Sequence, residues 1–258
     1  METVGEWVWL ADNIKIAEEY TVGYWKGLRD KLPVDENPDN QDWDEALKIF
    51  ETRVNTRFIN PIVEISKMDP DAGKGEGFSV VALQCILIEF FEAFYEGRTF
   101  ILKRGTLNAD ESRTKYNRSD EMFKNFLTEH EPFSAFFCTH DKNNGDLSCN
   151  LISYYTFYNN FRCGLLHEAA TKGSSIIRIE KNDKDGKPLD PEHKILIEKC
   201  GNKIILYRTP FQKALEQYLK NYKSELMSSG DRKENFKNKM DELCQIPNPW
   251  FILLMEAI

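Results

Sequence analysis

Apolar and polar residues alternate along most of this chain at the spacing of amphipathic helices. The first such segment covers residues 7–31, and its candidate core positions are Trp7, Trp9, Leu10, Ile14, Ala17, Tyr20 and Tyr24. A second helix is expected over residues 42–68. Within it Pro61 should kink or split the helix, because proline has no backbone N–H to donate.

The pattern continues with two better delimited helices. The third is expected to begin at Ser79, as its N-cap, and to end at Tyr95, where Gly97 follows as a stop. Residues 103–118 are polar and are expected to form an exposed loop. A fourth helix is expected over residues 119–129, capped by Ser119.

The next apolar segments are rich in aromatic residues. A short helical piece is expected over residues 132–138 and a loop over residues 139–147. The helix that follows should run from Ser148 to about Ala170. Its apolar positions are Leu151, Ile152, Tyr155, Tyr158, Phe161, Leu165 and Leu166.

After residue 173 the pattern changes to short β-branched runs. These are residues 176–179, 194–197 and 203–207, separated by Asp185-Gly186 and Gly201-Asn202. Such runs and turns predict a small antiparallel sheet of two or three strands. Thr209-Pro210 then opens a helix to about Met227, and a last helix covers residues 231–244.

The expected fold is therefore a single, mainly α domain over residues 1–258, shaped as a helical bundle. It divides into a helical core over residues 7–172, a β-hairpin region over residues 174–208 and C-terminal helices over residues 209–258. The hydrophobic content of 41% is enough for one large core or two modest ones.

Charge and composition narrow the class of protein. The formal net charge of −8 argues against a general nucleic-acid coat protein, because such proteins usually present a basic surface. It does not exclude an enzyme with a small local basic site. Residues 1–6 are acidic where a secretory signal would be basic, and the scattered cysteines suit a reduced compartment, so we expect a cytoplasmic protein.

We expect no membrane partner. The longest apolar stretch, residues 80–91, is interrupted by Gln84 and Glu89. It is too short to span a bilayer and is typical of a core helix.

The candidate chemistry lies in residues 157–173, which read Phe-Tyr-Asn-Asn-Phe-Arg-Cys-Gly-Leu-Leu-His-Glu-Ala-Ala-Thr-Lys-Gly. Arg162 and His167 stand in an otherwise apolar, aromatic-rich segment. An arginine guanidinium fits phosphate oxygens, and histidine exchanges protons near neutral pH. Together they are the minimal equipment for breaking an RNA phosphodiester without a metal.

The spacing alone leaves a structural explanation open. A pair at this separation also arises by chance, a helical arginine is usually solvated, and a lone histidine is usually structural. Residues five apart on an ideal helix are offset by roughly 140° and about 7.5 Å, so the two side chains would not share one face. Gly164 could allow a local bend, or His167 could lie past the regular helix.

The run Phe-Arg-Cys-Gly-Leu-Leu-His-Glu-Ala, preceded by aromatic-Asn-Asn and followed by Thr-Lys-Gly, resembles the signature of the HEPN superfamily. In that family an arginine, four to six variable residues and a histidine lie late in a four-helix-type domain. The resemblance covers the motif, and the helical region over residues 7–172 is loosely compatible with it. Many such proteins are ribonucleases in toxin–antitoxin, abortive-infection and CRISPR-related defence, and others are catalytically silent. Active members often carry Asn, Asp or His after the arginine, where this chain has Cys163.

The resemblance implies a homodimeric, metal-independent endoribonuclease that needs no cofactor. His167 would act as general base or acid on the ribose 2′-OH or the leaving 5′-oxygen, and Arg162 would hold the phosphate. The products would be a 2′,3′-cyclic phosphate and a 5′-OH. RNA is the expected ligand, and an antitoxin or a nucleotidyltransferase would be a partner besides the second copy.

Four further residues are weaker candidates. Asn159 and Asn160 would orient substrate, or they are ordinary polar helix positions. Lys172 would add a phosphate contact, or it is a solvated cation near a helix end. Glu89 interrupts an apolar helix, and a buried carboxylate needs a partner, for which Arg162 is a candidate.

Other functions remain open on the sequence. A non-catalytic module of the same kind, binding RNA, a nucleotide or a protein, is favoured by Cys163 and by the acidic charge; an unrelated helical interaction protein is a third hypothesis. Cys138, His140 and Cys149 could bind zinc, although their spacing fits no standard pattern. Residues 73–77 are glycine-rich but lack the Gly-Lys-Ser/Thr ending of a phosphate loop.

Overall fold

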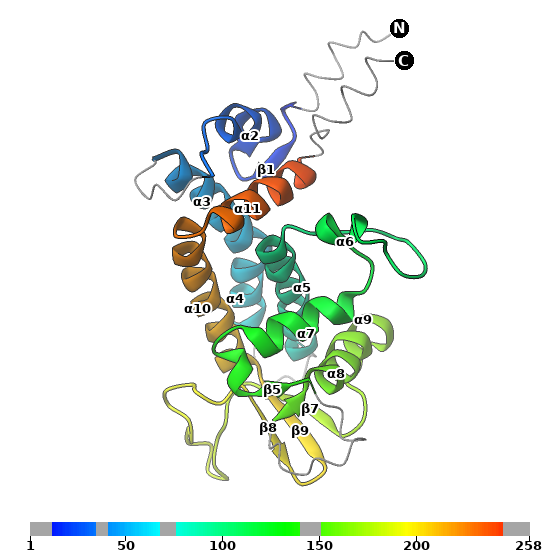
Figure 1. The fold of residues 1–258 in the computed structure, drawn as a ribbon. Coiled ribbons are helices and arrows are strands. Elements are labelled where there is room, and N and C mark those ends of the chain that lie inside the picture. Colours follow the sequence, from blue (N-terminus) through cyan, green and yellow to red (C-terminus); the bar gives the residue numbers. More distant parts are fainter. Residues whose placement is uncertain (1–11, 35–40, 68–75, 140–150, 245–258) are drawn as a thin grey trace, which may run out of the picture. The chain divides into compact units, whose positions relative to one another are not determined.

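The computed structural model of this chain describes residues 12–34, 41–67, 76–139 and 151–244 (Figure 1). Over these residues the fold is mainly helical with small β-sheets, as expected. The start of the first expected helix, most of the glycine-rich run, most of the loop at residues 139–147 and the C-terminal tail lie outside the described residues.

The chain divides into two compact units, each assembled from separate segments. Unit 1 comprises Met1–Ile59, Ala93–Asn117 and Lys223–Ile258, and unit 2 comprises Asn60–Glu92 and Arg118–Tyr222. Two helices, α5 (Glu76–Glu96) and α10 (Arg208–Met227), begin in unit 2 and end in unit 1. The expectation of one domain over the whole chain stays a prediction.

Unit 1 packs around the ring of Phe236. Its elements are β1 (Lys15–Ala17), β2 (Tyr20–Thr21), α2 (Val22–Arg29), α3 (Gln41–Val54), η1 (Asn55–Ile59), β3 (Thr99–Phe100), α6 (Glu111–Thr114), β4 (Lys115–Tyr116), α11 (Gly230–Leu243) and the ends of α5 and α10. The centroid of the Phe236 ring lies 5.5–6.2 Å from those of Trp25, Trp43, Phe50 and Phe94. Such aromatic pairs stabilise by about 0.5–1.5 kcal/mol beyond the area that they bury.

The helix expected over residues 7–31 is wrong in its middle part. β1 and β2 form a short antiparallel pair there, and α2 begins only after Thr21. Between the strands Glu18 has φ 39°, which is incompatible with a right-handed helix. The Thr21 hydroxyl then accepts a hydrogen bond from the Tyr24 N–H as the N-cap of α2. A local turn and a cap thus override the helical spacing.

Two other segments, one in unit 1 and one that begins there, also differ from their expected structure. Residues 103–118 are not only a loop, because they include helix α6 and strand β4, which pairs in parallel with β3. The helix expected over residues 42–68 is divided into α3, the π-helical η1 and α4 (Asn60–Ser66). Pro61 cannot donate to the carbonyl of Arg57, which explains why the division occurs there.

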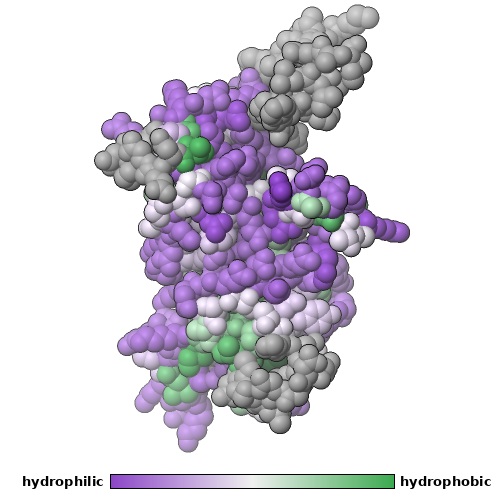
Figure 2. Space-filling view, in the orientation of Figure 1, coloured by the Kyte–Doolittle hydropathy of each residue, from purple (hydrophilic) through white to green (hydrophobic). Residues whose placement is uncertain are grey.

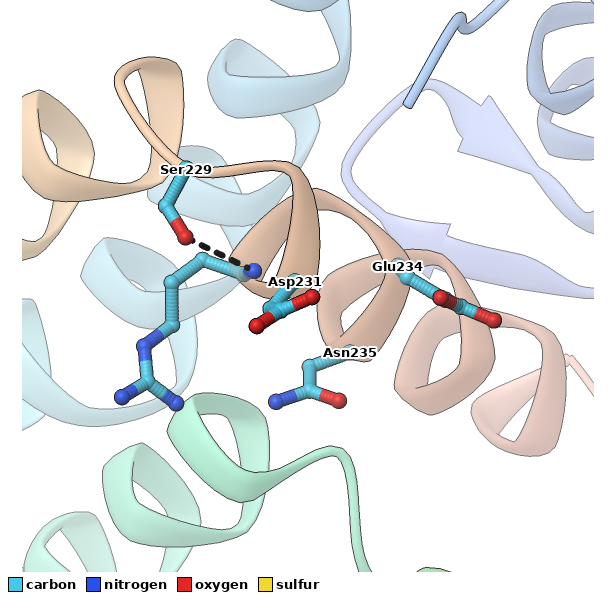
Figure 3. A pocket seen from close by; sticks show the side chains of 5 residues that line it. Ser229, Asp231, Glu234 and Asn235 are labelled. Atoms are coloured by element: carbon cyan, nitrogen blue, oxygen red, sulfur yellow. Dashed lines mark hydrogen bonds between the residues drawn. The ribbon is translucent and has the colours of Figure 1, made fainter. Parts of the chain in front are cut away.

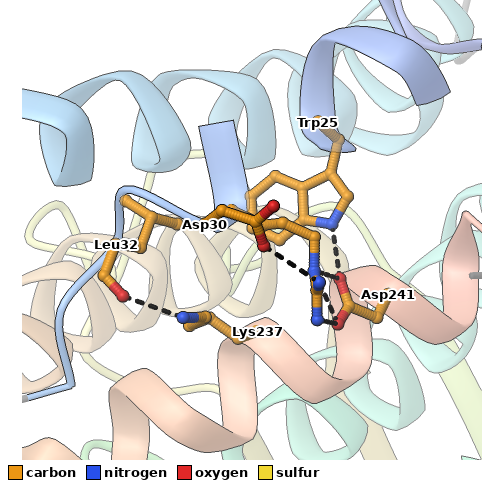
Figure 4. A network of polar contacts seen from close by, with 6 residues as sticks. Trp25, Asp30, Leu32, Lys237 and Asp241 are labelled. Carbon is orange, nitrogen blue, oxygen red and sulfur yellow. Dashed lines mark hydrogen bonds and ion pairs between the residues drawn. The ribbon is translucent and has the colours of Figure 1, made fainter. Parts of the chain in front are cut away.

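A polar network connects α2 to α11 inside unit 1 (Figure 4). The Asp241 carboxylate accepts hydrogen bonds from Trp25 Nε1 at 2.7 Å and from Arg29 Nε at 2.8 Å. Lys237 Nζ donates to the Leu32 carbonyl at 2.8 Å. The hydrogen bond with Asp241 raises the pKa of Arg29, although partial burial opposes it. Asp241 therefore accepts hydrogen bonds from two residues of a different helix.

Unit 2 has its own aromatic core. Its elements are α4, α7 (Ser119–Glu129), η3 (Phe133–Ala135), β5 (Phe137–Cys138), β6 (Ile152–Ser153), α8 (Tyr154–Phe157), η5 (Tyr158–Cys163), α9 (Gly164–Glu168), β7 (Ser175–Arg178), β8 (Ile197–Cys200), β9 (Lys203–Tyr207) and the first parts of α5 and α10. Phe157 is fully buried, and its ring centroid lies 5.3–6.3 Å from those of Phe123, Phe137, Phe161 and Phe211. The helix expected over residues 119–129 is confirmed as α7.

The helical piece expected over residues 132–138 is wrong in its second half. It is a short 3-10 turn, η3, followed by strand β5, which pairs in parallel with β6. The start of β6 lies where the long helix at residues 148–170 was expected. Strand pairing therefore replaces helix at both places. It joins Phe137-Cys138 to Ile152-Ser153, and each dipeptide contains one residue that favours strands.

Helix α5 is longer than the apolar stretch that predicts it. It begins at Glu76 instead of Ser79 and ends at Glu96, one residue after the expected Tyr95, and Gly97 follows as the expected stop with φ 68°. Among the described helices it alone is long and apolar enough to cross a bilayer. However, 56% of its apolar 18-residue stretch is buried in the fold. Gln84 and Glu92, both buried, make polar contacts with α10 and with His130. These contacts are those of a core helix.

The sheet of unit 2 is mixed, which corrects the expected antiparallel sheet. β8 and β9 form the antiparallel hairpin that Gly201-Asn202 predicts, but β7 pairs with the other edge of β9 in parallel. The second run is also displaced, from residues 194–197 to β8. Figure 1 shows these strands next to each other. On the face drawn in Figure 2 the surface is mostly hydrophilic, and apolar areas gather around the strands of unit 2.

Replacing Asp241 by Ala should lower the free energy of unfolding by about 2–3 kcal/mol, because Arg29 and Trp25 Nε1 would lose their acceptor away from bulk water. Denaturant unfolding measures the loss. The matched control is Glu242→Ala at the neighbouring exposed position, which should stay within about 0.5 kcal/mol. Equal stability of the two variants would contradict this role of Asp241.

Candidate functional site

The segment that carries Arg162 and His167 is not one regular helix. The helix expected over residues 148–170 consists of α8, the π-helical η5 and α9, and it ends at Glu168. At the end of η5 the Gly164 N–H donates to the carbonyl of Asn159, five residues back, and also to that of Phe161. Such π turns are rare and occur often at functional sites.

The π turn frees one carbonyl group, and the returning chain uses it. In a regular α-helix the Asn160 carbonyl would accept from the Gly164 N–H. Here it accepts from the backbone N–H of Lys172 at 2.9 Å. The Asn160 side chain adds a hydrogen bond from Nδ2 to the Ser175 hydroxyl at 3.1 Å. Asn160 thus fixes the turn after α9 to the π segment.

This return requires a glycine at position 164. A Cβ there would overlap the carbonyl oxygen of Ala170 and would lie 3.3 Å from the backbone nitrogen of Lys172. Ala169 has φ 51° and ends α9, and the Ala170 N–H donates to the Gly164 carbonyl at 3.3 Å. Gly164 therefore permits close backbone approach, which agrees with the local bend that the sequence left open.

Arg162 lies against Glu89 of α5. Their closest charged atoms, Nη2 and Oε2, are 3.7 Å apart, and both side chains are about four-fifths buried. The other carboxylate oxygen of Glu89 accepts a hydrogen bond from the Ser119 hydroxyl at 2.6 Å. The contact between Glu89 and Arg162 that the sequence suggested is present in the structure. That Glu89 orients Arg162 for a functional site stays a prediction.

Ser119 also has a different role from the one expected. The N-cap of α7 is Arg118, and the Ser119 hydroxyl points to Glu89 instead of capping its own helix. Three elements, α5, α7 and η5, thus converge on one carboxylate. The sequence around Ser119 does not show whether its hydroxyl caps α7 or bonds to another element.

The surroundings of Arg162 are aromatic and sulfur-rich. Its guanidinium carbon lies 5.4 Å from the centre of the Tyr158 ring, within the range of a cation–π interaction. Burial raises the pKa of Tyr158 to about 12, although the charge of Arg162 acts against this rise. Burial also raises the pKa of the Cys85 thiol, which Arg162 partly opposes. Arg162 Nε is buried and has no hydrogen-bond partner among the described residues.

His167 is placed differently. It lies in the last turn of α9, and its side chain is exposed. No hydrogen bond or ion pair joins it to Arg162 or to any other residue in the described ranges. The structure therefore presents an exposed imidazole and a sheltered guanidinium on the same segment, without direct contact between them.

The weaker candidates have structural contacts. Lys172 Nζ forms an ion pair with Glu168 at 2.8 Å, which raises the pKa of the lysine. Asn159 Nδ2 donates to Asn160 Oδ1 at 3.3 Å. Asn160 holds the returning chain, as described above. The sequence reasoning missed Tyr158 and Cys85 as neighbours of Arg162, and Ser119 as a hydrogen-bond donor to Glu89.

Other candidates do not form a site in the described structure. His140 and Cys149 lie outside the described residues, and within the described ranges no group of three or more His, Cys, Asp or Glu residues could hold a metal ion. The run at residues 73–77 is described only from Glu76, where α5 begins.

A cleft of about 330 Å³ lies in unit 1 at the start of α11 (Figure 3). It is lined by Ser229, Asp231, Arg232, Glu234 and Asn235, none of which the sequence singled out. Arg232 Nη1 and Asn235 Nδ2 both donate to the Tyr95 carbonyl, at 2.8 and 2.9 Å. Because carbonyls in the last turn of a helix lack intrahelical donors, these side chains cap α5. Part of the lining therefore serves the fold.

No protein-family model, no curated protein and no solved structure matches this chain. The resemblance to the HEPN superfamily therefore stays a prediction.

Replacing Gly164 by Ala should lower the free energy of unfolding by about 1–3 kcal/mol, because the methyl group would push apart two backbone segments. Gly27 is the matched control: it also lies in a helix, and a Cβ there would meet nothing within 4 Å. Gly27→Ala should stabilise by about 0.5–1 kcal/mol, since alanine favours helix. If denaturant unfolding gave both variants the same shift, the close approach at Gly164 would be wrong.

Proposed function

We propose that this protein is an endoribonuclease that cleaves RNA by attack of the ribose 2′-OH, with Arg162 and His167 as its catalytic residues. The observation that supports this most strongly is the state of Arg162. It is sheltered in a π turn and lies against Glu89, five residues before an exposed histidine, and its Nε has no hydrogen-bond partner in the described ranges. A guanidinium held in this way is restricted before any phosphate arrives.

In the proposed reaction the 2′-oxygen bonds to phosphorus and the P–O5′ bond breaks. His167, as general base, accepts the 2′-OH proton or, as general acid, supplies a proton to the leaving 5′-oxygen. Arg162 stabilises the charge that develops on the non-bridging oxygens. The products are a 2′,3′-cyclic phosphate and a 5′-OH, and the other proton exchanges with water. DNA lacks the nucleophile and is not cleaved.

Because Arg162 and His167 do not contact each other, one copy of the described chain does not bring the two side chains together at one phosphate. We propose a homodimer in which the motifs of the two copies face one RNA phosphate, as the resemblance implies. The exposure of His167 is compatible with a partner or a substrate approaching it. A cytoplasmic role in defence, or in a toxin–antitoxin pair with an antitoxin or nucleotidyltransferase, belongs to the same proposal.

A non-catalytic module that binds RNA, a nucleotide or a protein is the second candidate. The specific observation in its favour is that His167 has no hydrogen bond to orient it within the described residues. General bases are usually oriented by a neighbouring group. This candidate predicts that RNA is bound without being cleaved.

His167→Ala should reduce RNA cleavage in EDTA by about 10²–10⁴-fold, since a general acid or base typically contributes that much. Arg162→Ala should reduce it by about 10²–10³-fold through loss of charge stabilisation. Fragment ends are analysed for cyclic phosphate. The controls are His193→Ala and the exposed Arg113→Ala, which should cleave like the wild type. Cleavage that persists in His167→Ala would contradict the proposal, and intact RNA bound by the wild type would favour the second candidate.

Glu89→Gln should impair catalysis through Arg162 while keeping an oxygen for Ser119 to bond. Because the guanidinium would lose the carboxylate that positions it, we expect kcat to fall by about tenfold. KM should change less, as for interactions made mainly in the transition state. Ser119→Ala, which leaves the charge in place, should have a smaller effect. An unchanged kcat in Glu89→Gln would remove Glu89 from the site.

A further inference from the structure

Unit 1 contains a sheltered arginine, Arg53, whose surroundings differ from those of Arg162. Arg53, in the last turn of α3, donates from Nη1 to the Ile16 carbonyl of β1 at 2.6 Å. Arg57, in the π-helical η1, donates from Nη2 to the same carbonyl at 3.5 Å. Two guanidinium groups therefore converge on one neutral oxygen.

Within the part of the chain that the structure describes, no carboxylate forms an ion pair with Arg53 or Arg57. Other arginines that are largely out of solvent lie against acids: Arg29 against Asp241, Arg98 against Glu96 and Arg208 against Glu76. Within the described residues Arg53 and Arg57 form no ion pair, although the chain carries 42 acidic residues and a net charge of −8. Buried charges are normally paired, and among the described residues these two arginines have no counter-ion.

The cost of this arrangement is visible at Arg53. Its Nε is buried, and no described residue forms a hydrogen bond with it. Burial and, second, the nearby charge of Arg57 lower the pKa of Arg53 to about 10. Arg57 is exposed, so an anion could reach the pair from solvent. A group that carries negative charge and several acceptor oxygens would satisfy both side chains.

We propose that Arg53 and Arg57 form a phosphate-binding site on unit 1, separate in its residues from the proposed catalytic pair. Guanidinium forks match a phosphoryl group better than a halide ion, because they can donate two parallel hydrogen bonds to two of its oxygens. The ligand is a phosphoryl group, carried either by a free nucleotide or by the backbone of RNA. This proposal does not depend on cleavage and stands if the protein is a binding module.

The test is the rise in unfolding temperature of the full-length protein in inorganic phosphate, compared with chloride at equal ionic strength. The wild type should be stabilised by phosphate with a saturating dependence. Arg57→Gln should weaken the apparent phosphate affinity by about tenfold or more, because it removes a charged donor. Arg104→Gln, which removes an exposed arginine elsewhere in unit 1, should leave the affinity unchanged.

Arg53→Lys is the second variant, because it keeps the charge and removes the fork. It should also weaken phosphate binding while the protein stays folded. Competition distinguishes the sources: displacement of phosphate by a nucleoside diphosphate indicates a nucleotide, and displacement by a short RNA without terminal phosphates indicates the RNA backbone. A phosphate response that is absent from the wild type, or that is the same in wild type and Arg57→Gln, would overturn the proposal.

Discussion

The local structure of the candidate site depends on the hydrogen bond from the Lys172 N–H to the Asn160 carbonyl. That carbonyl is available because the Gly164 N–H, in the π turn over η5, donates to the carbonyls of Asn159 and Phe161 instead. The bond returns the chain across the helix that it has just left, and only a glycine at position 164 leaves room for it. The segment that carries Arg162 and His167 therefore departs from one regular helix, although the two side chains do not contact each other in the described structure.

The same segment explains how a core region can also present chemistry. Phe157 and Phe161 fill the core of unit 2, while Arg162 turns to the carboxylate of Glu89 on α5. Glu89 is in turn held by the hydroxyl of Ser119. A positive charge sheltered from water interacts more strongly with a nearby negative charge than a solvated one does, and Glu89 restricts where the guanidinium lies. His167 lacks such support within the described chain, which is why a second copy or the substrate itself must orient it in the proposed reaction.

How much of this the sequence could predict depends on the range of the interactions. Helices with strong apolar spacing, such as α7 and α10, were predicted within a residue or so, and Gly97 was predicted as the stop of α5. Glu89 was linked to Arg162 because a carboxylate in an apolar helix needs a partner. The strands around Glu18, the parallel pairing of β7 with β9 and the π turn were not predicted. They depend on a turn conformation, on contacts between distant segments and on a carbonyl that no side-chain pattern marks.

The measurement that tests the central claim most directly uses an RNA oligonucleotide with a single 2′-deoxy nucleotide at the position that the wild-type protein cleaves. If the 2′-OH is the nucleophile and the Arg162–His167 segment assists it, cleavage at that position should disappear while other positions are still cut. Cleavage at the 2′-deoxy position, or no cleavage of the unmodified RNA, would contradict the account.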